Sequence, residues 1–109
     1  MKIAIIILTD PLRGSQEALT RMLNALAMAN ECQRAGDTTE IVFAGTGTRW
    51  PAELSKLTYP ANGIYESVRT LIKGASRSCA MRTQAVEGQE EAGVELLGDN
   101  MKFPVRRAL

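Results

Sequence analysis

The chain begins with an uninterrupted apolar run, Ile-Ala-Ile-Ile-Ile-Leu over residues 3–8. Apolar and polar positions do not alternate in it, which is typical of a strand buried on both faces, such as a central strand of a parallel sheet. Helical spacing of apolar residues over 16–35 and a second β-branched run over 40–44 follow. We expect a βαβ unit with a right-handed crossover.

The remaining pattern continues the alternation of helices and strands. The expected elements are a short helix over 50–57, a helix from Asn62 that stops at Gly74, a weak strand or strand-to-loop junction over 76–81, a polar helix over 84–92 and a strand over 94–97. This order predicts one domain, residues 1–109, of the α/β class: a three-layer α/β sandwich with a mainly parallel sheet. Ligand sites in such sheets lie at the carboxyl ends of the strands. Three loops qualify, namely 9–14, 45–50 and 76–82.

Composition excludes several classes of protein. Among the 109 residues, 13 are Lys or Arg and 12 are Asp or Glu, so the net charge of +1 selects neither nucleic acid nor an anionic membrane. No apolar run approaches the roughly 20 residues of a membrane-spanning helix. The opening run is also too short for a secretory signal, so we expect a cytoplasmic protein.

The chain contains no histidine. A Ser-His-Asp triad, a Cys-His dyad and an imidazole metal site are therefore excluded within it. Two cysteines cannot supply the four thiolates of a structural zinc site. We expect neither a metal nor a cofactor.

Cys79 is the strongest candidate for chemistry. The charged residues from 69 to 82 are Arg69, Lys73, Arg77 and Arg82, with no acid among them. Positive charge stabilises a thiolate and lowers its pKa. The alternative is an ordinary part-buried cysteine. Cys32, inside the long helix, is interpreted as a small core residue.

Other candidates are weaker. Gly45 and Gly47 follow a strand, but Trp50 stands where a dinucleotide fingerprint needs its third glycine, so a tight turn is favoured. Asp10 and Glu53 are the only acids near strand ends with a chance of acid–base work. The carboxylates of residues 87–99 fit a solvated face that could pair with the basic segment of another chain.

The order and spacing of several motifs resemble the DsrE/DsrF-like family, small sulfur-relay-type proteins that include the Tus sulfur-transfer subunits. The resemblance extends to about residue 100 and rests on the following motifs: Thr9-Asp10, Leu23-Asn24-Ala25-Leu26, Gly36-Asp37, Gly45-x-Gly47-Thr48-x-Trp50-Pro51, Gly74-Ala75-x-x-x-Cys79-Ala80 and Glu91-Ala92-Gly93-Val94-x-Leu96-Leu97. It implies a three-layer α/β fold, assembly into trimers or hexamers, and a persulfide-carrying cysteine, for which Cys79 is the matching position.

Two positions depart from the family pattern. Ser76 stands where many relatives have the first cysteine of Cys-x-x-Cys, so a dithiol cycle within the loop is not expected. Residues 98–109 do not match the relatives' last helix and closing strand. Either the sheet lacks that edge strand or a partner chain covers the edge.

These observations leave two leading functions. The first is a small cytoplasmic protein that accepts and relays sulfane sulfur on Cys79, with a sulfur donor or acceptor protein as partner. The second is a non-catalytic oligomeric ligand-binding protein of the same fold. Its pocket would use residues of the three loops, of which the candidates are Asp10, Gly45, Gly47, Trp50, Ser76, Arg77 and Arg82. An enzyme without cysteine chemistry is a third, less favoured possibility.

Overall fold

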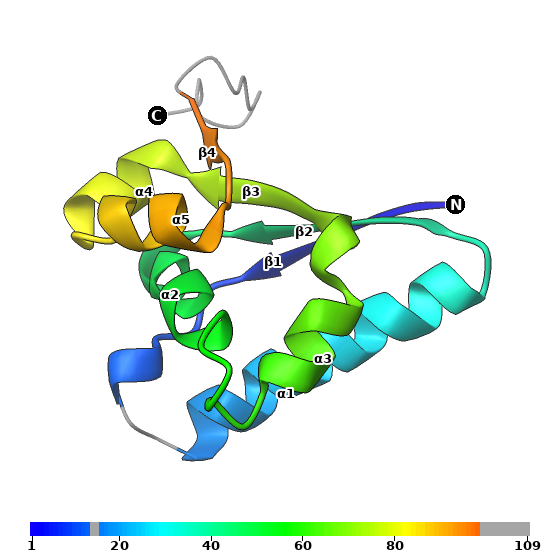
Figure 1. Ribbon diagram of the computed structural model, residues 1–109. Coiled ribbons are helices and arrows are strands. Elements are labelled where there is room, and N and C mark those ends of the chain that lie inside the picture. The colour runs from blue at the N-terminus through cyan, green and yellow to red at the C-terminus, as the bar shows by residue number, and fades with distance from the viewer. Residues whose placement is uncertain (14–15, 99–109) are drawn as a thin grey trace.

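Four parallel strands form one sheet in the computed structural model, which describes residues 1–13 and 16–98 (Figure 1). The strands lie in chain order and are β1 (Lys2–Ile7), β2 (Thr38–Phe43), β3 (Ile72–Ser76) and β4 (Leu96–Leu97). Five α-helices occur within the described ranges. The predicted α/β class with a parallel sheet is confirmed, and the arrangement is consistent with a three-layer α/β sandwich.

The placement of β1 differs from the prediction. It lies at one edge of the sheet and pairs with β2, Ile5 beside Ile41 and Ile7 beside Phe43. Alternate residues of β1 are exposed, and Ile6 retains 56% of its accessible surface. The prediction that this run is buried on both faces is therefore wrong. Each further strand is added on the same side of the one before it, so the sheet grows in one direction from β1 to β4.

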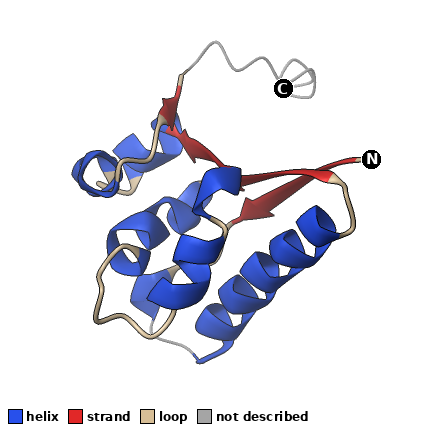
Figure 2. Ribbon diagram, turned by 45° about the vertical axis from the view of Figure 1, so that its right-hand side comes forward, coloured by secondary structure: helices blue, strands red, loops and turns tan. Residues whose placement is uncertain are grey.

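The long helix α1 (Gln16–Arg34) is confirmed almost to the residue. Its apolar stripe buries Met22, Leu26 and Ala29 against the sheet. Gly36, at φ 90°, makes the turn into β2, a conformation that favours glycine. Figures 1 and 2 both place α1, α2 (Trp50–Leu54) and α3 (Asn62–Ser67) on one side of the sheet.

The segment between β2 and β3 contains the second difference. After the 3-10 turn η2 (Gly45–Arg49), α2 ends at Leu54, and α3 stops at Ser67 rather than at Gly74. A 3-10 turn η3 (Arg69–Leu71) leads into β3, so Ile72 and Gly74 lie in a strand. The apolar spacing over 64–72 fits a helix, but the Glu95 carbonyl, just before β4, and the Leu97 side chain lie so close to Gly74 that there is no room for a side chain there.

The segment between β3 and β4 is helical. The expected weak strand or junction over 76–81 is instead the helix α4 (Arg77–Arg82), followed by α5 (Val86–Ala92). Both helices lie beside the carboxyl ends of the strands (Figure 2). Gly93 ends α5 at φ 72°, as its sequence position predicts. The atypical segment beyond residue 98 lies outside the described residues.

The core lies between the sheet and the helices. Its largest buried side chains include Phe43 of β2, Trp50 of α2, Tyr65 of α3 and Met22 of α1. No helix among the described residues is long and apolar enough to span a membrane.

Candidate functional site

Cys79 lies in the first turn of α4, at the carboxyl end of β3. Ser76 is the N-cap of this helix, and its hydroxyl oxygen accepts a hydrogen bond of 3.4 Å from the Cys79 amide. Serine is favoured at this position because its side chain satisfies an amide that has no partner within the helix. Ser76 thus fixes the start of the helix that carries Cys79.

The Cys79 sulfur is half-buried and is surrounded by hydrogen-bond donors. Partial burial by itself raises the pKa of the thiol. Hydrogen bonds from the Ser76 hydroxyl, the Gly45 amide and Arg82, together with the charge of Arg82, outweigh burial and hold the pKa of Cys79 below its ordinary value. The Arg82 Nη2 atom lies 3.8 Å from the sulfur. The site therefore stabilises a thiolate.

The causes of this shift only partly match the sequence-based argument. Arg82 contributes, as predicted, through both a hydrogen bond and its charge, but the hydrogen bonds from Ser76 and Gly45, which are uncharged, each lower the pKa more than either of these two effects. Arg77, in contrast, is exposed at the start of α4 and is not among the groups that lower this pKa.

Gly45 reaches the sulfur because η2 folds tightly against β1. The Thr46 hydroxyl donates a 3.0 Å hydrogen bond to the Leu8 carbonyl, and the Gly47 amide donates one of 2.9 Å to the Ala44 carbonyl. A β-carbon at Gly47 would collide with the Ile7 carbonyl, so only glycine fits. These glycines form the expected tight turn, and Gly45 directs its amide at Cys79.

Asp10 and Trp50 belong to a second cluster. The Asp10 carboxylate accepts a 2.9 Å hydrogen bond from the Leu12 amide and pairs with Arg49 at 2.8 Å. The Trp50 indole N–H donates to the Thr9 hydroxyl at 3.1 Å, and the ring is fully buried. Both side chains join the 9–14 loop to the segment after β2. These contacts give both side chains a structural role, which is to hold the two segments together.

A buried polar network connects η2 to α4 and α5, and nothing in the sequence analysis indicated it. The Thr48 hydroxyl lies 2.7 Å from that of Thr83, and the Gln89 amide nitrogen donates to the Thr48 carbonyl. Gln89 is fully buried although α5 is rich in Glu. Gln89 has helical spacing from the buried residues Ala85 and Ala92, and this spacing was the signal in the sequence that Gln89 would be buried. The network fixes η2, and hence the Gly45 amide, relative to α4.

A cavity lies beside this network. It has a volume of about 410 Å³ and is lined by Leu12, Arg49, Glu53, Thr83 and residues of α5. Cys79 does not line it. The cavity meets the 9–14 and 45–50 loops only at Leu12 and Arg49, and the rest of its lining comes from residues 52–53 and 83–91. None of the seven candidate binding residues lines it.

The second cysteine lies in a different element from Cys79. Cys32 is half-buried in α1, far along the chain from any strand end. Among residues 1–13 and 16–98, no group of three metal-ligating side chains comes together. Comparisons with protein-family models, curated proteins and solved structures find no match to this chain.

Proposed function

We propose that this chain is a small sulfur-relay protein in which Cys79 accepts sulfane sulfur as a persulfide and passes it to a second thiol. One observation carries the proposal: hydrogen-bond donors from two segments that are distant in sequence, Ser76 and Arg82 on one side and Gly45 on the other, converge on one half-exposed sulfur. The resemblance to the DsrE/DsrF-like family supports the same residue.

The chemistry balances without an external oxidant. The Cys79 thiolate attacks the outer sulfur of a donor persulfide, R–S–SH, so that a Sγ–S bond forms as the donor S–S bond breaks. The donor leaves as the thiolate R–S⁻, and the proton stays on the outer sulfur. The lone pair of the thiolate forms the new S–S bond, and the electron pair of the broken S–S bond leaves on the donor, so the oxidation of Sγ is matched by the reduction of the donor's inner sulfur. Attack by an acceptor thiolate on the outer sulfur then restores the Cys79 thiolate.

The donors around the sulfur serve both steps. In the first step they lower the pKa of Sγ and so increase the share of the nucleophilic thiolate. In the second step Sγ is the leaving group, and a thiol of lower pKa leaves faster. Neither step needs an imidazole or a second cysteine in the same chain, which agrees with the absence of histidine and with serine at position 76.

Mass spectrometry tests the proposal directly. The reduced protein is incubated with glutathione persulfide, and we expect a gain of one sulfur atom on the peptide that contains Cys79, reversed by dithiothreitol. The variant Cys79→Ser should gain none, and the matched variant Cys32→Ser should gain as much as the unmodified chain. No gain on Cys79, or an equal gain on Cys32, contradicts a relay function.

A second candidate function rests on the cavity of about 410 Å³ near Arg49. A non-catalytic protein of this fold would bind a small molecule there. Saturable ligand binding that is unchanged in Cys79→Ser, together with no sulfur transfer, would favour it.

We also propose that the chain works in the cytoplasm as a homo-oligomer. Thiols stay reduced in that compartment, as a relay cysteine requires. The outer edge of β1 is unpaired among the described residues, and Ile6 and Leu8 beside it are 56% and 60% exposed. An exposed edge with apolar neighbours is usually covered, and closed assemblies of identical chains do so most simply. The trimer or hexamer is favoured by the family resemblance alone.

A further inference from the structure

A second cavity lies at the opposite end of β3 from Cys79. It has a volume of about 210 Å³ and lies between α3, η3 and the segment that enters β4. Tyr65, Arg69, Lys73, Val94 and Glu95 are among the residues that line it. At about 30 Å³ for each water molecule, the volume suits a small organic molecule rather than a single water.

Tyr65 provides the clearest indication of a ligand. Its side chain is fully buried, and its hydroxyl has no hydrogen-bond partner among the described residues. Buried hydroxyl groups in folded proteins nearly always have a partner, because an unmade hydrogen bond leaves the cost of desolvation uncompensated. Since Tyr65 lines the cavity, a ligand with an acceptor oxygen would supply that partner.

Arg69 adds a charged donor that is held in position. Its Nη2 atom donates a 2.9 Å hydrogen bond to the Ala92 carbonyl at the end of α5. Its Nη1 atom lies 3.4 Å from both carboxylate oxygens of Glu66, longer than charge-assisted hydrogen bonds usually are. The Arg69 charge also acts on Tyr65, where it opposes the larger effect of burial, which raises the pKa of the phenol. Tyr65 therefore stays protonated and can donate.

The charges around the cavity limit the ligand. Arg69 and Lys73 line it together with one carboxylate, that of Glu95. Glu66 lies beside Arg69, and the Lys73 ammonium is 3.9 Å from the Glu40 carboxylate, so both cations are already partly balanced. These groups leave no excess of positive charge, which disfavours a dianion, so a ligand here would carry at most one negative charge, placed at the guanidinium edge of Arg69.

We propose that this cavity binds a small monocarboxylate, whose oxygens accept hydrogen bonds from the Tyr65 hydroxyl and from Arg69. The site is separate from Cys79 and does not depend on the proposed sulfur chemistry. A carboxylate has two acceptor oxygens in one plane, which matches one hydroxyl and one guanidinium edge.

Titrations followed by two-dimensional NMR test this assignment. The full chain is titrated with propionate, with phosphate and with chloride at equal ionic strength, and the amide signals of Gly93 and Val94 are followed. We expect saturable shifts with propionate alone. Shifts no larger than those with chloride would mean that the cavity holds only water, and equal binding of phosphate would contradict the charge argument. Either result overturns the proposal.

Two tyrosine variants make the test specific. Tyr65→Phe removes only the buried hydroxyl, and we expect propionate to bind it about tenfold more weakly. Tyr59→Phe is the matched control, because Tyr59 packs against Trp50 and does not line the cavity. Cys79→Ser should bind normally, which separates this site from the relay. Unchanged binding by Tyr65→Phe overturns the assignment.

Discussion

At the scale of single residues, the character of Cys79 depends on where hydrogen-bond donors point. The uncharged donors Ser76 and Gly45 lower the pKa of the thiol more than the charge of Arg82 does. A hydrogen bond requires close, directed contact, whereas a charge at the surface is screened by solvent. A count of nearby basic residues therefore finds the cysteine but ranks its partners incorrectly.

The lowered pKa predicts different reactivity for the two cysteines. Because the Cys79 pKa lies below its ordinary value, the thiolate persists to lower pH, and we expect iodoacetamide to label Cys79 faster than Cys32 at neutral pH. Rates measured by mass spectrometry across a pH series should inflect at lower pH for Cys79. Equal rates, or faster labelling of Cys32, would refute the assignment of the reactive thiol.

Ser76 should raise the reactivity of the thiol. In Ser76→Ala the sulfur loses its largest stabilising hydrogen bond, so its pKa should rise and alkylation at neutral pH should slow. Helix α4 also loses its N-cap, at a cost of about 1 kcal/mol. Ser67→Ala is the matched control, since Ser67 is exposed in α3. Unchanged alkylation of Cys79 in Ser76→Ala would contradict this role.

At the scale of elements, the 3-10 turn η2 holds the site together. It supplies the Gly45 amide to Cys79, the Thr48 groups to Thr83 and Gln89, and Arg49 to Asp10. One short segment after β2 thus joins the loop after β1 to the helices after β3. Movement of η2 would disturb all of these contacts together.

Substitution at Gly47 tests this dependence. Gly47→Ala places a methyl group against the Ile7 carbonyl, and we expect a loss of about 2–4 kcal/mol in the free energy of unfolding, measured in urea, together with slower alkylation of Cys79. Gly63→Ala is the matched control. Gly63 lies in α3 with open space around it, so alanine should stabilise the chain by about 0.5–1 kcal/mol. Equal stability of the two variants would contradict this account of η2.

The cap of α4 also predicts a redox change. Residue 76 is the N-cap and residue 79 lies three positions later, and the Ser76 side chain already accepts a hydrogen bond from the Cys79 amide. Ser76→Cys should therefore form a disulfide with Cys79 under mild oxidation. Thiol counting under native conditions measures this. Two free thiols in the folded variant under every oxidant tried would contradict the geometry.

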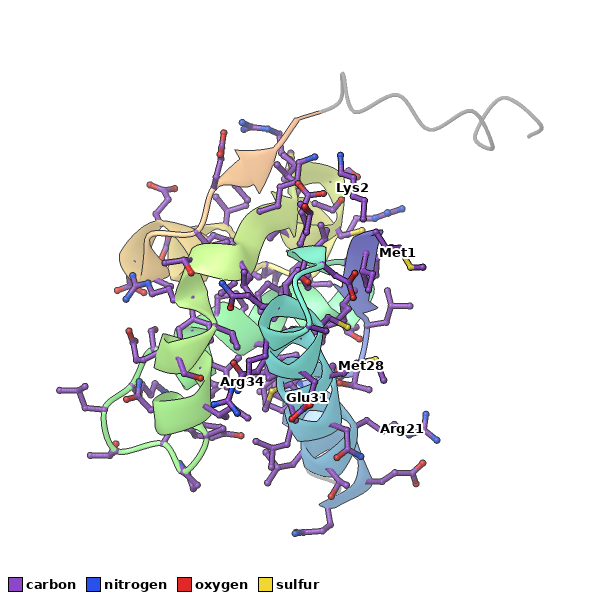
Figure 3. All side chains as sticks on the ribbon, turned by 90° about the vertical axis from the view of Figure 1, so that its right-hand side faces the viewer. Met1, Lys2, Arg21, Met28, Glu31 and Arg34 are labelled. Atoms are coloured by element: carbon purple, nitrogen blue, oxygen red, sulfur yellow. The ribbon has the colours of Figure 1, made fainter. Side chains whose placement is uncertain are left out.

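At the scale of the whole molecule, the surface beside β1 is unusual. Figure 3 shows this side, where Met1, Lys2, Arg21 and Met28 lie along one border of the molecule. Met1 and Met28 are largely exposed, and Ile6 and Leu8 add further apolar surface. The net charge of +1 gives little repulsion between copies. This surface is the part of the molecule best suited to contact another chain.

Size-exclusion chromatography with light scattering checks the proposed assembly. We expect a species that is a multiple of the 11.9 kDa chain at micromolar concentration. Ile6→Glu should dissociate it, because a charge would be buried against the partner. Leu57→Glu is the control, since Leu57 is exposed in the segment after α2. A monomer formed by the unmodified chain would refute the assembly.

The sequence by itself determined the features that local patterns encode. The periodicity of α1, the β-branched runs of β1 and β2, the glycine that ends α5 and the basic surroundings of Cys79 all follow from neighbouring residues. Together they indicate a parallel α/β domain and a candidate for its reactive residue. The end of α3 escaped prediction because apolar spacing near Ile72 satisfies both a helix and a strand.

Tertiary structure decided what depends on contacts between distant segments. Strand order put β1 at an edge, although its composition suits a central strand, because composition records apolarity and not the number of neighbours. Three features arise only where distant segments meet. They are the Gly45 amide at Cys79, the buried Gln89 beside Thr48, and the Tyr65 hydroxyl that has no partner among the described residues. Burial and hydrogen bonding are properties of the packed chain, and no local pattern specifies them.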